Sequence, residues 1–263
     1  MGICTESKNL IYYTKGKQTT KELEISTQKP SLGKGCIGEV FPHKLNPMHL
    51  VVKKSKASLV NEFEIGSHLD HPNIVKVRAL YIKQSSNNNP LKYKLVMDRI
   101  YGKQLKELYK TGLDNASVHS LLTQAQSACI YLFTQKVKWG DVNGENAYVS
   151  EKNQLTVADF GQWKIEQSPE KRGFSLLKET QKIMFNILSV SSLRNTEKSS
   201  FKDLLFSLDP YSKDGTPTKK TIQILKTPLT KGDFQNKSEE EVQEILTTYC
   251  AQVINNFQNS PIF

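Results

Sequence analysis

Three polar residues stand at spacings that fit phosphate and metal chemistry. Asp141 and Asn146 are five positions apart, and Asp159 follows Asp141 by eighteen. Phosphoryl transfer needs one carboxylate to orient a nucleophilic hydroxyl, and an amide oxygen and a second carboxylate to hold Mg²⁺ between the phosphates. A turn predicted over 150–154 would fold these groups back into one pocket. Taken singly, each residue could equally be a turn residue or a helix cap.

A glycine-rich turn is predicted upstream, from the pattern G-x-G-x-x-G-x-V formed by Gly33, Gly35, Gly38 and Val40. Glycines let backbone N–H groups approach phosphate oxygens without an intervening side chain. The pattern alone is a weak signal, because an ordinary glycine-rich hairpin or a dinucleotide-binding turn could produce it. The dinucleotide-binding alternative fails on context, since a strand rather than a helix is predicted to follow.

A lysine and a glutamate complete the set of candidate site residues. Lys53 lies near the end of the apolar strand LVVKK, fifteen residues past Gly38. A lysine beneath a phosphate-binding turn can hold α- and β-phosphates, although a lone strand lysine is more commonly a guard against aggregation. Glu62, on the next predicted helix, could pair with Lys53 and fix its position.

The elements that must position these residues divide the chain in two, and the fold class expected is α+β. The first part is β-rich, with turn chemistry and β-branched runs, and the second shows apolar residues at helical spacing. The domains expected are an N-terminal arm over 1–30, a β-rich lobe over 31–98 and a helical lobe over 99–263. The strands and helices predicted are a hairpin and third strand over 31–54, a helix over 58–69, strands over 74–82 and 91–97, a helix over 118–132, strands over 147–149 and 155–158, and a helix over 174–190.

The last helix has the clearest start. Ser238 and Glu241 form the capping-box pattern S-x-x-E, in which each side chain bonds the backbone N–H of the other residue. The residues before it, 209–237, are rich in Pro, Lys and Thr and are predicted to be a long connection.

The chain resembles the eukaryotic-type protein kinase superfamily over about residues 31–190. Besides the glycine turn, HPNIVKV at 71–77 is similar to the kinase segment between the third helix and the fourth strand. KLVMDRIYGKQL at 94–105 is similar to the interlobe hinge, and VADFG at 157–161 to the metal-binding element. The resemblance implies a bilobal protein-kinase-like fold, with a β-rich N-lobe and a mostly helical, reduced or atypical C-lobe.

The resemblance also implies an activity and roles for individual residues. It implies transfer of the ATP γ-phosphate to a protein hydroxyl, of serine or threonine rather than tyrosine, with Mg²⁺ or alternatively Mn²⁺. Lys53 and Asp141 would be catalytic, and Asn146 and Asp159 would hold the metal. The residues that would bind ATP are Gly33, Gly35, Gly38, Val40, Lys53, Glu62, Met97 in the gatekeeper place, Asp98 and Ile100.

The sequence departs from the kinase pattern at several positions. The usual His-Arg-Asp reads Trp139-Gly140-Asp141, so a phosphate on the activation segment would lack its arginine partner. The lysine usually found two residues after the catalytic aspartate is Asn143, and Lys54 is a candidate compensating cation. The interval from Lys53 to Glu62 is about half the usual length, so the helix that corresponds to the family's third helix must be short, or the pairing is wrong.

The activation segment is the most reduced part of the pattern. Ser168-Pro169-Glu170 stands where Ala-Pro-Glu is expected, only a few residues after Gly161. This compact plan resembles the minimal kinases that bacterial pathogens deliver into host cells, which would make the substrate a host protein. Two alternatives remain. One is a kinase-fold enzyme that phosphorylates a small molecule, a lipid headgroup or an inositol phosphate, since Gly140-Asp141 is similar to the His-Gly-Asp of aminoglycoside and choline phosphotransferases. The other is a pseudokinase that serves as a binding module.

Charge and composition limit which partners and which cellular location are expected. The net charge of +10 lies mostly in residues 1–100, with 16 Lys and Arg against 8 Asp and Glu. A polyanionic ligand on the N-lobe is therefore one expectation, a solvated basic face is another, and nucleic acid is not expected. No apolar run suits a transmembrane segment or a secretory signal. The four cysteines form no C-x-x-C pair, and this favours a reduced, cytoplasmic setting. For a delivered effector that setting would be the host cytosol. Met1-Gly2-Ile3-Cys4 invites N-terminal lipidation, but Glu6 replaces the required Ser or Thr.

Overall fold

A computed structural model describes most of the chain, in two compact units. The first unit comprises Met1–Ile100 with Asp159–Gly161, and the second comprises Tyr101–Ala158 with Gln162–Phe263. The lipidation motif, Cys36, Asn143 and most of the predicted connection lie outside the described residues. The described residues are 10–14, 17–19, 27, 29–35, 37–83, 92–109, 111–141, 144–190 and 229–259.

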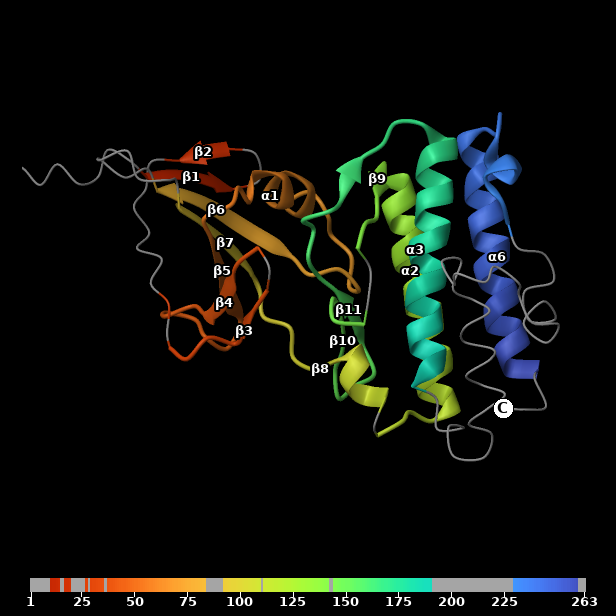
Figure 1. Ribbon diagram of the computed structural model, residues 1–263, viewed down its shortest axis with the longest axis horizontal. Helices are drawn as coiled ribbons and strands as arrows, with labels where there is room; N and C mark the ends of the chain where they lie inside the picture. The colour runs from red at the N-terminus through yellow and green to blue at the C-terminus, as the bar shows by residue number, and fades with distance from the viewer. Residues whose placement is uncertain are drawn as a thin grey trace, which may run out of the picture. The chain divides into compact units, whose positions relative to one another are not determined.

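An antiparallel sheet of seven strands forms the first unit (Figure 1). Its order is β2-β1-β6-β7-β5-β4-β3, and β-branched residues are frequent in its central strands, as expected for a pleated, buried surface. On β5, Val51, Lys53 and Ser55 face one side of the sheet, because side chains alternate along a strand. The strands are β1 (Leu10–Thr14), β2 (Lys17–Thr19), β3 (Gly33–Lys34), β4 (Glu39–Pro42), β5 (Leu50–Ser55), β6 (Val77–Lys83) and β7 (Lys92–Asp98).

Within the N-terminal arm predicted for 1–30, the described residues include two strands that belong to this sheet. β1 pairs with β6, from Leu10 opposite Lys83 to Tyr13 opposite Leu80, so these residues extend the sheet. Thr27 forms an isolated bridge with His43, and its hydroxyl accepts a hydrogen bond from Lys54 Nζ at 2.6 Å. The run LIYYT has the β-branched and aromatic residues of a strand, but its partner strand lies about seventy residues further along the chain.

A short helix, α1 (Val60–Gly66), is the main helical element of the first unit. It spans seven residues and buries Glu62, Phe63 and Ile65, as the short interval after Lys53 required. Its last residue approaches β6 so closely that a Cβ atom at Gly66 would overlap Val77. The helix is therefore held by packing against the sheet rather than by its length.

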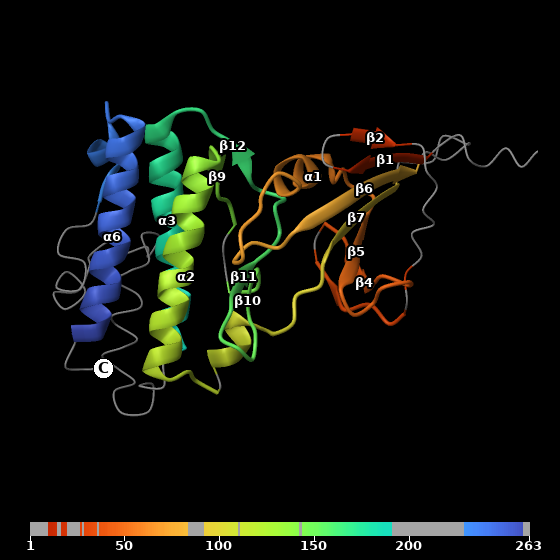
Figure 2. The ribbon, with the colours of Figure 1, turned by 180° about the vertical axis from the view of Figure 1, so that it is seen from behind.

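Three long helices run side by side in the second unit (Figures 1 and 2). They are α2 (Asn115–Thr134), α3 (Pro169–Ser189) and α6 (Glu239–Asn259). Each turns an apolar stripe towards the others, and Asp114 is the N-cap of α2, with its Oδ1 accepting from Ser117 N at 2.7 Å. The capping box of α6 is confirmed: Ser238 N donates to Glu241 Oε2 at 2.8 Å, and Glu241 N donates to Ser238 Oγ at 3.2 Å.

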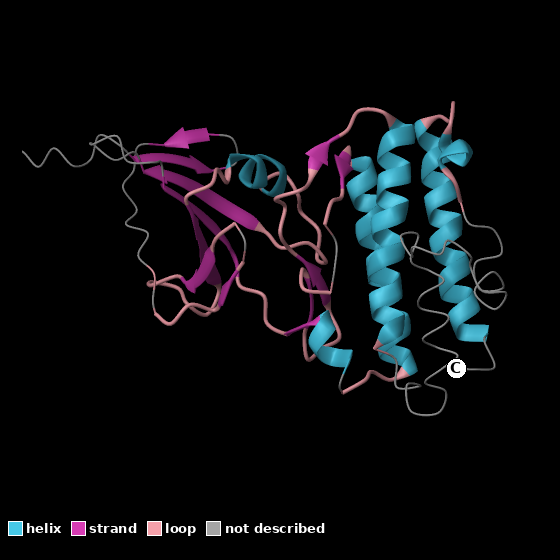
Figure 3. Cartoon of the chain, viewed as in Figure 1, coloured by secondary structure: helices cyan, strands magenta, loops and turns pink. Residues whose placement is uncertain are grey.

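Small strands and short 3₁₀ helices join the elements of the second unit, and Figure 3 shows how strands and helices are distributed along the chain. Part of the connection predicted over 209–237 is structured: η4 buries Phe234, which packs on Phe174 with ring centroids 6.1 Å apart. Within the described residues, no helix is long and apolar enough to cross a membrane. The α+β class predicted from the sequence is confirmed. The remaining elements are β8 (Lys103–Gln104), η2 (Leu105–Tyr109), β9 (Val137–Lys138), β10 (Ala147–Val149), β11 (Leu155–Val157), β12 (Lys164–Ile165) and η4 (Lys231–Phe234).

Candidate active site

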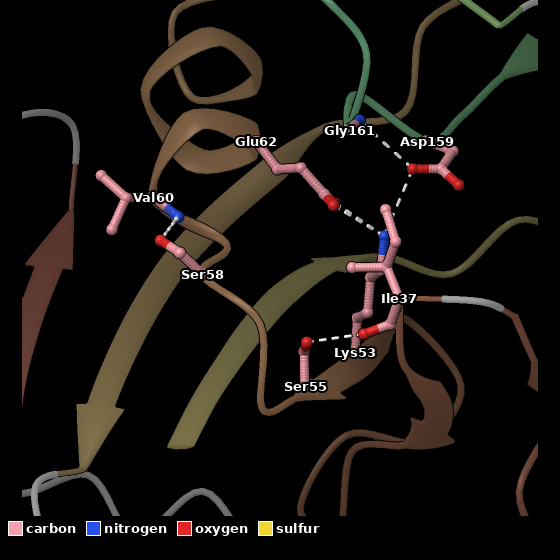
Figure 4. Close-up of polar contacts among 8 residues, drawn as sticks. All are labelled: Ile37, Lys53, Ser55, Ser58, Val60, Glu62, Asp159 and Gly161. Carbon is pink, nitrogen blue, oxygen red and sulfur yellow. Dashed lines mark hydrogen bonds and ion pairs between the residues drawn. The ribbon is translucent and has the colours of Figure 1, made fainter. Parts of the chain in front are cut away.

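A cluster of three charged residues, two of them buried and the third, Asp159, partly exposed, lies on one face of the first unit's sheet. Lys53 is only 8% exposed and comes from the central strand β5, between β4 and β7. Its Nζ donates to Glu62 Oε1 at 2.8 Å and to Oε2 at 2.9 Å, and it contacts Asp159 Oδ1 at 3.3 Å (Figure 4). The pairing of Lys53 with Glu62 anticipated from the sequence is confirmed. The ammonium group therefore lies between two carboxylates from distant parts of the chain.

Burial governs the electrostatics of this cluster. Glu62 lies in the first turn of α1 and is 3% exposed, and removal from water raises the pKa of its carboxyl. Lys53 opposes that rise by its charge and its hydrogen bonds, whereas the negative charge of Asp159 adds to it. A buried carboxylate with a bidentate lysine is held in one position, so the lysine is held as well.

Asp159, Phe160 and Gly161 form a tight turn beside this cluster. Asp159 has a φ of 68°, in the left-handed region, and its Oδ1 accepts from Gly161 N at 3.3 Å. Phe160 is fully buried and approaches the end of α1, where a Cβ atom at Gly66 would lie 3.1 Å from its ring. Packing of Phe160 thus fixes the carboxylate of Asp159 against Lys53.

The glycine-rich turn joins β3 to β4 in the same unit. Gly33 pairs with Val40, and Gly35 N donates to Gly38 O at 2.9 Å. A Cβ atom at Gly38 would overlap the Lys54 carbonyl, so only glycine allows the turn to lie this close to β5. The Ile37 side chain reaches Gly161, within 3.1 Å of the point that a Cβ atom there would occupy.

The residues assigned to the hinge lie at the end of β7. Met97 is buried and pairs in register with Val51. The Asp98 carboxylate accepts two hydrogen bonds from Arg78, each of 2.7 Å, so its side chain is committed to that ion pair. Ile100 is half-buried and is the last residue of this part of the first unit.

The second unit brings Asp141 and Asn146 together. Asn146 Nδ2 donates to the Asp141 carbonyl at 3.0 Å, which turns the amide oxygen of Asn146 away from that carbonyl. Asp141 has a φ of 55°, a backbone conformation that side chains other than Asn, Asp and Gly rarely adopt. Ala158, which directly precedes Asp159 in the chain, donates its N–H to the Asn146 carbonyl at 2.9 Å. Oxygen donors such as those of Asn146 and Asp159 are of the type that Mg²⁺ prefers.

The departure from His-Arg-Asp has a steric cause. Trp139 is buried and packs edge-to-face on Trp163, with ring centroids 5.7 Å apart. At the next position, a Cβ atom on Gly140 would lie 2.5 Å from the Gln162 carbonyl oxygen. No side chain fits there without moving the backbone, so arginine is excluded from this position.

Arg172 is a buried charged residue of this region that no sequence motif marks. It follows Ser168, which caps α3 by accepting from Lys171 N at 3.3 Å. Arg172 is fully buried, and its Nη1 donates to the carbonyls of Glu166 at 2.6 Å and Gln167 at 3.2 Å. Its Nη2 bonds Glu239, and its guanidinium lies over the Phe133 ring, 4.4 Å from the centroid.

The spacing of Arg172 from the buried residues of α3 indicates in the sequence that its side chain is buried. It stands four residues before Leu176 and eight before Thr180, in line with the fully buried stripe of α3. An arginine in line with an apolar stripe needs an internal partner. Its hydrogen bonds hold the residues that follow β12, where the chain returns from Gly161.

The structure thus forms two clusters from the predicted site residues. Lys53, Glu62 and Asp159 meet in the first unit, and Asp141 and Asn146 meet in the second. The roles assigned to all of them in catalysis and in ATP binding stay predictions. Within the described residues, no group of three or more His, Cys, Asp or Glu side chains could hold a metal ion.

Comparison with known proteins agrees with this arrangement. The family model described as "Protein kinase domain" matches residues 27–184, more than half of the chain. Aurora kinase A-A of Xenopus laevis is 31% identical over 155 residues, which cover 54% of this chain and 36% of that protein. Aurora kinase B of Xenopus tropicalis is 28% identical over 185 residues, and Aurora/IPL1-related protein kinase 2 of Caenorhabditis elegans 28% over 174.

These two matches cover 65% and 60% of this chain and 49% and 53% of the relatives, so the chain matches between about a third and a half of the length of these three proteins. The β-rich first unit and the helical second unit are those of a bilobal kinase fold. The chain belongs to the protein kinase family.

Proposed function

We propose that this chain transfers the γ-phosphate of ATP to the hydroxyl of a serine or threonine in a protein, with Mg²⁺ bound. The observation that carries the proposal is that the buried Lys53 bridges Glu62 and Asp159. A scaffold has no chemical need to bury a lysine between two carboxylates. A phosphate-binding lysine does need a fixed position, because a flexible side chain would lose entropy each time it bound.

Each residue has a role in this proposal. Lys53 would bind the α- and β-phosphates of ATP, with Glu62 holding its ammonium group in place. The Asp141 carboxylate would orient the acceptor hydroxyl and take its proton. Asp159 and Asn146 would hold the Mg²⁺, which neutralises charge on the phosphates when bound. The glycine turn would offer backbone N–H groups to the phosphate oxygens.

We further propose that activity needs no phosphate on the activation segment. Arginine is excluded at position 140 by the Gln162 carbonyl, so a phosphate would lack its usual partner. Arg172 already binds the carbonyls of Glu166 and Gln167, and Glu166 N donates to the Lys136 carbonyl at 2.9 Å. These internal bonds support an activation segment that is ordered without modification.

The test is phosphate transfer by the purified full chain. Wild-type protein treated with phosphatase should transfer labelled phosphate from Mg-ATP to itself or to a generic protein acceptor. Asp141→Ala should lose this transfer by at least about 100-fold, the scale of a lost general base. Asp70→Asn is the matched control, because Asp70 is an exposed partner of Lys76. Absence of transfer by the wild type with Mg²⁺ and with Mn²⁺ would contradict the proposal.

Mass spectrometry of the same reactions, with and without cell lysate, reads out the acceptor. Phosphoserine or phosphothreonine supports the proposal, and phosphotyrosine alone rejects the proposed acceptor type. If the chain is instead a binding module with the kinase fold, it should transfer no phosphate. Any cellular effect it has should then survive Asp141→Ala.

One observation favours a second candidate, phosphorylation of a small molecule. Only six residues separate Gly161 from Ser168, the N-cap of α3, which leaves little chain to support a peptide acceptor. The excess of basic residues over 1–100 would suit an inositol phosphate. A panel of metabolite acceptors separates the two candidates, because ATP consumption that depends on a metabolite and not on protein would favour the second.

A further inference from the structure

Ser55 is a buried polar residue of the first unit that none of the proposed catalytic roles uses. It is the last residue of β5, two positions after Lys53, and therefore faces the same side of the sheet. It is 8% exposed, and its Oγ donates to the Ile37 carbonyl at 2.6 Å (Figure 4). Ile37 belongs to the glycine turn. Ser55 thus joins the strand that carries Lys53 to the turn above it.

The hydrogen bond from Ser55 orients one peptide unit. In a trans peptide the carbonyl of one residue and the N–H of the next point in opposite directions. The peptide between Ile37 and Gly38 is trans, so drawing the Ile37 carbonyl to Ser55 directs the Gly38 N–H away from Ser55. Among the residues that the structure describes, none accepts a hydrogen bond from Gly38 N.

Two further contacts fix the position of the turn along β5. Gly35 N donates to Gly38 O at 2.9 Å, which closes the turn. The backbone of Gly38 lies against the Lys54 carbonyl, where no side chain would fit. These contacts locate the turn along β5, but rotation of the Ile37–Gly38 peptide plane is restrained by Ser55.

We propose that Ser55 is a positioning residue for a nucleotide phosphate. Its hydroxyl fixes the Ile37–Gly38 peptide so that the Gly38 N–H is directed to a phosphate oxygen held by Lys53. The inference rests on the proposed use of ATP and adds a residue outside the glycine turn that makes the turn effective. A preoriented donor costs no reorganisation when the anion binds. Without Ser55 the peptide can rotate and present its carbonyl, which repels phosphate.

The experiment measures the affinity of the full chain for ATP, ADP and adenosine by calorimetry. Ser55→Ala should weaken ATP and ADP binding about tenfold, the scale of one hydrogen bond to a charged group, and leave adenosine binding unchanged. In kinetics KM for ATP should rise while kcat changes little. Ser55→Thr keeps the hydroxyl and should restore the affinity for ATP. Ser58→Ala is the matched control, because Ser58 is exposed and its Oγ accepts a hydrogen bond from Val60 N at 3.3 Å.

Hydrogen exchange provides a readout that needs no nucleotide. In Ser55→Ala, backbone N–H groups of residues 33–40 should exchange faster, while those of β6 and β7 keep their protection. Faster exchange throughout the sheet would indicate general destabilisation and overturn the inference. Equal weakening of ATP and adenosine binding, or unchanged ATP binding, would also overturn it while leaving the proposed function standing. A wild-type chain that binds no ATP would reject the proposed function, and this inference with it.

Discussion

The backbone carbonyl of Gln162 stands 2.5 Å from the point that a Cβ atom on Gly140 would occupy. The segment that contains Gly140, next to Asp141, and the segment that contains Gln162 are therefore packed backbone to backbone. Trp139 and Trp163 pack edge-to-face beside this contact, which joins the same two segments.

Substitution of Gly140 should destabilise the second unit. Gly140→Ala should lower the free energy of unfolding by about 2 kcal/mol, because the backbone of Gln162 has to move. Gly140→Arg, which restores the family pattern, should lower it at least as much and should not raise activity. Urea denaturation measures both. Gly232→Ala is the control, because its nearest neighbour would be Thr230 Oγ1 at 3.5 Å. An unchanged midpoint for Gly140→Ala would contradict the steric explanation.

The buried carboxyl of Glu62 should make stability depend on pH. Burial raises the pKa of Glu62 above its ordinary value of 4.5 in the folded chain. A raised pKa contributes stability that is fully present below pH 4.5 and is lost as the pH rises through the folded-state pKa. The free energy of unfolding of the wild type, relative to Glu62→Gln, should therefore fall between pH 4.5 and neutrality.

Urea denaturation of both variants at several pH values measures this difference. Glu64→Gln, on the exposed side of the same helix, corrects for the general effect of removing a carboxyl group from α1. If the free energy of unfolding of the wild type relative to Glu62→Gln rose with pH instead, the attraction of Lys53 would outweigh burial. The pKa of Glu62 would then be lowered in the folded chain, not raised.

The ion pair between Arg172 and Glu239 should stabilise the second unit. Glu239→Gln leaves the buried guanidinium without its carboxylate and should lower the free energy of unfolding by about 2 kcal/mol, less than for a fully buried pair because Glu239 is partly exposed. Glu240→Gln, at the exposed neighbouring position, should change it by less than about 0.5 kcal/mol. Thermal unfolding of the three proteins measures the effect. Equal melting temperatures would show that the backbone carbonyls alone satisfy Arg172.

The capping box at the start of α6 provides a test of local structure. Ser238→Ala removes the oxygen that accepts from Glu241 N and should cost about 1 kcal/mol of stability. Ser238→Gly should lower the free energy of unfolding by only a few tenths of a kcal/mol, because glycine is a tolerated N-cap residue. Denaturant titration of both variants checks the order. If alanine and glycine had the same effect, the cap would contribute little.

Elements with a strong local signal were predictable from the sequence. These elements depend on residues that are close together in the sequence. They are the apolar spacing of α2, the β-branched run of β5 and the capping box at Ser238. The pairing of Lys53 with Glu62 was also predictable, because both residues stand in recognisable motifs only nine positions apart. The short α1 followed directly from that interval.

Features that depend on distant parts of the chain were not predictable. β1 pairs with β6, and the residues of β1 give no sign of which distant strand they meet. Arg172 is buried because Phe133 and Glu239 come from two other helices. The exclusion of arginine at position 140 depends on the path of Gln162, which no spacing in the sequence reveals.

The brevity of α1 has a consequence for any change that would withdraw Glu62 from Lys53. Seven residues make fewer than two full turns, and a helix of that size has little stability of its own in water. It exists because Phe63 and Ile65 are buried and Glu62 is bound to Lys53. Such a segment cannot pivot as a rigid rod and keep its shape, so withdrawing Glu62 from Lys53 amounts to melting the helix. Loss of the contact between Glu62 and Lys53 would then be an order-to-disorder transition of α1 rather than a rigid movement of an intact helix.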